Sequence, residues 1–98
     1  MTGDLRLRPE VEDDLLEAAV WYEQQRIDLG KEFLDAVAVT LSKISDSPLA
    51  YPTVHRATRR ALLPRFPFGV FYRVEDQTVV VIAILHGSRH PRNWRNRL

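Results

Sequence analysis

The spacing of apolar residues changes at the midpoint of this chain, and that change most limits the folds it can adopt. In the first half, apolar residues recur three or four positions apart, as on one face of an α-helix. In the second half they alternate with other residues or run together, which is typical of β-strands. Helices followed by strands predict an α+β fold, in which a helical hairpin covers one face of a mainly antiparallel sheet.

Two amphipathic helices are expected in the first half. The first runs from residue 9 to about residue 26, because Pro9 is tolerated in a first turn, where its missing N–H has no helical partner. Asp28 is suited to begin the second, since a carboxylate accepts hydrogen bonds from the exposed N–H groups of a helix start. Its apolar stripe runs from Phe33 to Ile44 and ends before Pro48, which disfavours helical geometry in the preceding residue.

Strands are expected at the N-terminus and throughout the second half. Alternating leucine and arginine over residues 5–8 predict a short strand before the helices. Residues 60–63 and 70–74 predict two strands of a meander, and residues 78–85 are apolar almost throughout, as in a central strand covered on both faces. If the helices cover the Val70 side of the sheet, Arg73 lies on the opposite, open side.

Length and composition bound the class of protein. The 98 residues predict one domain spanning residues 1–98. The chain has no cysteine, which excludes disulfides and thiolate chemistry. Its longest apolar run, residues 79–85, is far shorter than the ~20 residues of a membrane-spanning helix. The first residues lack the pattern of a secretory signal, so we expect a cytoplasmic protein without membrane contact.

The charge of the chain is divided between its two halves. Residues 1–50 carry eleven acidic and five basic side chains, whereas residues 51–98 carry two acidic and nine basic ones, all arginine. Arginine is suited to bidentate contact with carboxylate or phosphate and to stacking on flat rings. A clustered basic excess with Trp94 among the arginines indicates an anionic partner. The alternative is a solvated surface that balances the acidic helices, because single surface charges contribute little.

Other classes of site are poorly supported by the sequence. The three histidines are too widely spaced for a local zinc site, and no metal or cofactor is expected. Asp13, Asp14 and Glu17 fit the solvated face of a helix better than a carboxylate cluster. The chain contains neither the glycine pattern of a phosphate-binding loop nor a serine nucleophile elbow.

The order and spacing of several segments resemble the RelE/ParE family of small toxins from bacterial type II toxin–antitoxin systems. The resemblance covers residues 5–97. It is carried by Ala-Ala-Val-Trp-Tyr-Glu at 18–23, Leu-Gly-Lys-Glu-Phe at 29–33, the stretch 48–52, the arginine pair at 59–60, Phe-Pro-Phe-Gly-Val-Phe-Tyr-Arg-Val at 66–74, and Ile-Leu-His-Gly-Ser-Arg-His-Pro-Arg-Asn-Trp at 84–94. The resemblance implies two helices against a curved antiparallel sheet, which agrees with the apolar pattern.

The resemblance also implies a cognate antitoxin that wraps the toxin and neutralises it. We expect a hetero-oligomer in which an acidic and apolar antitoxin segment folds on binding and contacts Arg59, Arg60 and Arg65, or the groove beside the helices. Operator DNA would be bound only through the antitoxin.

Two activities occur in this family, and the residues favour one of them. Ribosome-dependent members cleave mRNA, which requires groups that transfer protons and cations that hold the phosphate. This chain has no lysine after Lys43, it has Gly69 where nuclease members carry a phosphate-contacting arginine, and it has Trp94 where they carry a tyrosine. Arginine stays charged at working pH and is a poor base.

We therefore expect a ParE-like inhibitor of DNA gyrase without enzymatic activity, of the kind associated with plasmid stabilisation. Four residues near the C-terminus are expected to contact the cellular target: Arg89, Arg92, Trp94 and Arg95. The alternative is a ribosome-dependent endoribonuclease that uses Arg60, Arg89 and His90. A third possibility is a non-toxic member that acts mainly as a partner of its antitoxin and of operator DNA.

Overall fold

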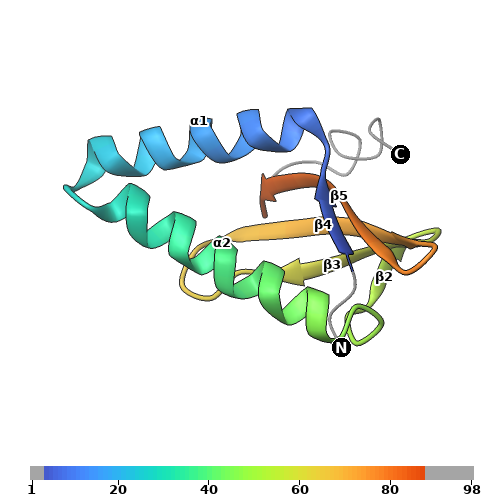
Figure 1. Ribbon diagram of the computed structural model, residues 1–98. Coiled ribbons are helices and arrows are strands. Elements are labelled where there is room, and N and C mark those ends of the chain that lie inside the picture. The colour runs from blue at the N-terminus through green and yellow to red at the C-terminus, as the bar shows by residue number, and fades with distance from the viewer. Residues whose placement is uncertain (1–3, 88–98) are drawn as a thin grey trace.

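The computed structural model describes residues 4–87, which form two helices and five strands (Figure 1). In chain order the elements are β1 (Asp4–Leu7), α1 (Pro9–Gln25), α2 (Leu29–Asp46), β2 (Thr53–His55), β3 (Thr58–Leu62), β4 (Phe68–Glu75) and β5 (Thr78–His86). The predicted α+β fold, with a helical hairpin on one side of the sheet, is confirmed.

The sheet is mixed, in the order β1-β5-β4-β3-β2. The three pairs formed by β2 to β5 are antiparallel, as expected for a meander. β1 instead pairs parallel to β5, with Leu7 opposite Val81. A parallel neighbour requires a long crossover connection, and here it runs through the helical hairpin and strands β2 to β4. The short strand β2 was not predicted, because three residues after Pro52 carry too little pattern to identify a strand.

The start of α2 differs from the expectation. Asp28 precedes the helix with a left-handed backbone (φ 71°), and its side chain accepts no capping hydrogen bond. The carboxylate of Glu23 on α1 takes that role instead, accepting the N–H of Asp28 at 2.9 Å and that of Gly30 at 3.0 Å. Gly30 is required there because a Cβ would lie 2.6 Å from the carbonyl oxygen of Ala19. The helices therefore meet closely at the tip of the hairpin.

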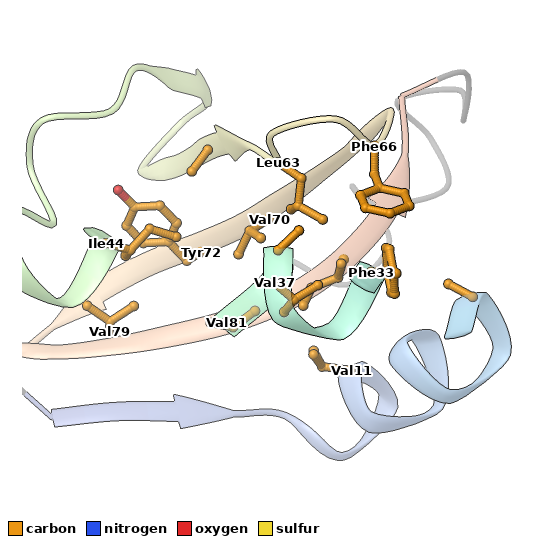
Figure 2. Close-up of a cluster of buried hydrophobic side chains, with 14 residues drawn as sticks. Val11, Phe33, Val37, Ile44, Leu63, Phe66, Val70, Tyr72, Val79 and Val81 are labelled. Atoms are coloured by element: carbon orange, nitrogen blue, oxygen red, sulfur yellow. The ribbon is translucent and has the colours of Figure 1, made fainter. Parts of the chain in front are cut away.

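The main core lies between the hairpin and the sheet (Figure 2). Its centre is Phe33 of α2, which is fully buried and contacts three rings: Tyr22, Phe66 and Phe68, at centroid distances of 5.3, 5.5 and 5.0 Å. Val70 and Tyr72 of β4 face the same cluster, together with Val81 of β5. Val70 thus lies on the side of the helices, which is the condition under which Arg73 was expected on the open side.

The opposite side of the sheet carries a second apolar cluster. Its buried residues are Phe71, Val80, Ile82, Ala83 and Leu85. A bulge shifts the register of β4 against β5 between Phe71, which lies opposite Ala83, and Tyr72, which lies opposite Val81. β5 is therefore buried on both faces, as its continuous apolar sequence predicted. We call this side of the sheet the open face, because neither helix covers it.

Tyr72 anchors the loop that follows α2. Its hydroxyl donates a 2.6 Å hydrogen bond to the carbonyl oxygen of Pro48, and its ring lies edge-on to that of Tyr51. Burial disfavours the phenolate and raises the pKa of Tyr72 from 10.0 to about 12. The phenol is therefore a structural donor at neutral pH.

Changing Tyr72→Phe is expected to lower the free energy of unfolding by about 1 kcal/mol at pH 7, because the Pro48 carbonyl loses its donor. Above pH 10 the unfolded wild-type chain releases the Tyr72 proton while the folded chain retains it up to about pH 12, so wild-type stability falls as pH rises. The variant lacks this loss, and the stability gap should narrow between pH 10 and 12. Urea unfolding at pH 7, 9, 10 and 11 measures the difference in unfolding free energy between the two proteins. A difference that stays constant with pH would contradict the raised pKa of Tyr72.

Candidate functional site

Arg59 is engaged within the protein. It pairs across the sheet with Tyr72, on the side that faces the helices. Its guanidinium donates to the carbonyl oxygen of Tyr51 and, at 3.3 Å, to that of Leu49. Those bonds hold the segment between α2 and β2 against the sheet. Arg59 therefore has a structural role. Its expected contact with an antitoxin stays a prediction.

Arg65 is engaged in an ion pair. Its guanidinium lies 2.8 Å from one carboxylate oxygen of Glu32, and Arg26 lies 2.9 Å from the other. The two hydrogen-bonded guanidinium groups, that of Arg65 first, hold the pKa of Glu32 below its usual value. Arg65 also lies 5.6 Å from the ring centre of Phe66. The cluster ties the tip of the hairpin to the β3–β4 loop across an exposed surface.

Arg60 is the member of the predicted trio that is exposed and whose side chain makes no ion pair or hydrogen bond within residues 4–87. It lies opposite Phe71 on the open face. Its aliphatic stem fills the space beside Gly69, because a Cβ on that glycine would lie 3.2 Å from both Cγ and Cδ of Arg60. A larger residue at position 69 would push the Arg60 side chain aside.

Two other arginines share the open face with Arg60. Arg6 of β1 and Arg73 of β4 both pair with Val80 of the intervening strand. Arg73 forms a 3.2 Å ion pair with Glu75, and its buried Nε atom has no hydrogen-bond partner among residues 4–87. The carboxylate nearest to Arg60 along β4 is Glu75, four residues beyond Phe71 and thus ~13 Å away at strand spacing. The arginines make this surface able to bind an anion.

The two histidines of residues 4–87 lie on different strands, and His55 is opposite Thr58, two positions before Arg60 on β3. His86 ends β5 opposite Phe68, on the side of the helices, and its ring lies edge-on to Phe68 at 5.4 Å. His55 lies on the edge strand β2. The remaining predicted site residues, Arg89, His90, Arg92, Trp94 and Arg95, lie outside the described residues. Within residues 4–87 no cluster of histidine and acidic residues has the composition of a metal site.

A hollow of the described surface lies beside α1, over the ends of β4 and β5. This pocket, of about 520 Å³, is lined by Asp14, Glu17, Ala18, Trp21, Tyr22, Pro67, Phe68, Ile84, Leu85 and His86. Its walls are mostly apolar. Trp21 is 56% exposed and lies edge-on to Tyr22 at 5.1 Å. We call this hollow the α1 pocket.

The α1 pocket exists because β1 is short. The β1–β5 ladder ends at Leu7 and Val81, apart from one further bond from the Arg8 N–H to the Val81 carbonyl. Further along β5, the N–H of Ile84 donates to the carboxylate of Asp14 on α1 at 3.2 Å, instead of to a neighbouring strand. The sequence indicated Asp14 and Glu17 only as part of a solvated face, and the pocket was missed. Trp21, outside the apolar stripe of the helix, was the one local signal.

Comparisons with known proteins agree with this architecture. The family model described as "ParE toxin of type II toxin-antitoxin system, parDE" matches residues 5–91. The protein Toxin ParE2 of two Mycobacterium tuberculosis strains, CDC 1551 and H37Rv, is 34% identical over 95 residues, covering 93% of this chain and 88% of the relative.

Solved structures show the same fold at lower identity. A chain of the RelBE2 toxin–antitoxin complex from Mycobacterium tuberculosis superposes with a TM-score of 0.64 at 22% identity, covering 88% of this chain and 99% of that one. A chain of the chromosomal ParDE toxin–antitoxin system of P. aeruginosa gives 0.64 at 18% identity, covering 87% and 96%. Within the part of the chain that the structure describes, neither helix is long and apolar enough to cross a membrane.

Proposed function

Because this chain belongs to the ParE toxin family of type II toxin–antitoxin systems, we propose that it acts in the cytoplasm by inhibiting DNA gyrase and that a cognate antitoxin neutralises it. The family assignment rests on a family model that matches most of the chain and on a relative 34% identical to it. Operator DNA is then contacted through the antitoxin.

The observation that carries the choice of target is the chemistry around Arg60. Cleaving RNA requires a base for the 2′-hydroxyl and an acid for the leaving oxygen, each worth about 10²–10⁴ in rate. Within residues 4–87 Arg60 lies opposite Phe71 on the open face, which it shares with Arg6 and Arg73. Tyr72 points to the other face, and its raised pKa of about 12 leaves almost no phenolate to act as a base at neutral pH. This environment supports inhibition by binding over RNA cleavage.

A direct comparison of the two activities tests the proposal. Purified gyrase should lose supercoiling activity, or accumulate cleaved DNA, when the toxin is added, and its cognate antitoxin should reverse the effect. A ribosome-programmed mRNA should stay intact at the toxin concentration that stops growth. The matched control is the same toxin premixed with antitoxin.

Codon-specific cuts in the mRNA that disappear in Arg60→Ala or His90→Ala would instead identify a nuclease. If neither gyrase nor mRNA responds while growth still stops, the target is a different one. A chain that does not stop growth at all would be a non-toxic member of the family.

The contacts of the arginines refine the expected antitoxin surface. Arg59 and Arg65 are bound to groups of the protein itself, whereas Arg60 is exposed at the open face. Recruiting Arg65 would require an antitoxin carboxylate to compete with Glu32, while Arg60 would lose no such contact. We therefore place the acidic part of the antitoxin segment on Arg60 first.

A further inference from the structure

We propose that the α1 pocket binds an arginine or lysine side chain of the antitoxin, beside Trp21 and Glu17, an inference that rests on the proposed partnership with an antitoxin. The site is separate from the arginines discussed above, because none of them lines the α1 pocket and Arg60 lies on the open face. It also requires the opposite charge in the partner.

The pocket combines an exposed ring with a carboxylate. Trp21 is more than half exposed although its ring is large and apolar, and the inner wall continues through Phe68 and Leu85. Glu17, one helical turn before Trp21, is exposed, and its side chain makes no ion pair or hydrogen bond within residues 4–87. A cation over an indole face gains from the ring quadrupole, and a neighbouring carboxylate adds an ion pair.

Asp14 and Glu17 have different roles at the rim. Asp14 accepts the N–H of Ile84 and thereby maintains the edge of β5, so its carboxylate serves the fold. The carboxylate of Glu17 makes no such hydrogen bond among the described residues, so its charge can pair with a group of a partner protein. The cation of the partner is therefore expected against Glu17, with its aliphatic stem along Trp21.

The surface beside the pocket indicates a polypeptide as its occupant. Leu16 and Val20 on the same helix are 65% and 48% exposed, so the apolar surface extends beyond the pocket along α1. The first half of the chain also carries a net charge of −6, from eleven acidic and five basic residues. A segment with apolar side chains and a basic one complements both features, and tryptophan and arginine are the residue types that dominate such interfaces.

Affinity measurements on the complex of the full-length toxin with its cognate antitoxin test the proposal. Trp21→Ala is expected to weaken binding by about 30-fold or more, as for a central anchor of an interface, and Glu17→Lys by about tenfold. Glu12→Lys is the matched control, because it makes the same charge change at an exposed position of α1 outside the pocket, and it should change affinity less than threefold. Equal effects of Glu17→Lys and Glu12→Lys would overturn the proposal.

The basic residue of the antitoxin can be identified in the same assay. Each arginine and lysine of the antitoxin is changed to alanine and measured against wild-type and Glu17→Gln toxin. One of them should lose most of its effect in the Glu17→Gln background, because the two changes remove the same contact. Additive effects throughout would contradict a contact with Glu17, even if Trp21→Ala failed to fold.

Fluorescence distinguishes the antitoxin from the remainder of the chain as the occupant. In the Trp94→Phe variant Trp21 is the one tryptophan, since the chain has two. The antitoxin should protect Trp21 from acrylamide quenching. If Trp21 is already protected in free toxin and antitoxin adds nothing, the chain itself fills the pocket and the proposal is wrong. An antitoxin that does not bind at all would instead refute the proposed partnership.

Discussion

Replacing Phe33 with alanine is expected to lower the free energy of unfolding by about 3–5 kcal/mol. Phe33 is fully buried, and its ring lies 5.0–5.5 Å from those of Tyr22, Phe66 and Phe68. The cavity left by the change would open where α1, α2 and the sheet meet. A domain of this size has a total stability of about 5–15 kcal/mol, so the loss is a large share of it.

Urea unfolding followed by circular dichroism measures this effect. The control is Leu34→Ala, because Leu34 is the next residue on α2 and is 42% exposed. We expect that change to cost less than about 1 kcal/mol, since only part of the side chain is removed from water on folding. Similar losses in the two variants would mean that the ring cluster does not hold the hairpin to the sheet.

The ring cluster also supports the α1 pocket. Tyr22 and Phe68 contact Phe33 on one side and line the pocket on the other. The wall of the pocket is thus an outer surface of the core. Its shape depends on packing between residues distant in sequence, which explains why a local pattern could not predict it.

Periodic segments of the sequence predicted the fold well. The stripes of the two helices and the apolar run of β5 each continue over many residues, and these elements were located to within a few positions. The parallel pairing of β1 with β5 could not be predicted, because it joins segments more than 70 residues apart. The sequence predicted Asp28 as the cap of α2, whereas Glu23 accepts the N–H groups at its start. This contact depends on how the two helices are placed against each other, which no local pattern encodes.

Residue type alone did not predict which arginine side chains are already bound within the protein and which can contact a partner. Arg59 and Arg65 are chemically equivalent to Arg60 in the sequence. In the folded chain Arg59 is bound by two carbonyl groups, and Arg65 pairs with Glu32, 33 residues away. Arg60 remains exposed, because its strand position places it on the open face and Gly69 leaves space for its stem. Alternation along β3 predicts that Arg59 and Arg60 lie on opposite sides of the sheet. Which of the two sides the helices cover is seen only in the three-dimensional structure.

The largest functional effect is expected from the double change of Arg89→Ala and Arg92→Ala. We hypothesise that these residues contact the cellular target, because they add cations and a nearby tryptophan beyond the central strand, where the apolar pattern does not require them. Induction of the variant should no longer stop growth, while its melting temperature should stay close to that of the wild type, because surface changes usually cost within about 0.5 kcal/mol.

A second double variant provides the control for lost charge. Arg6→Ala with Arg56→Ala removes the same two positive charges from exposed positions elsewhere in the chain, and it should still stop growth. A loss of toxicity in both variants would indicate a general requirement for positive charge. A marked fall in the melting temperature of the Arg89/Arg92 variant would mean that these arginines stabilise the fold, and the target contact would then have to lie on another surface, with Arg60 the first residue to change.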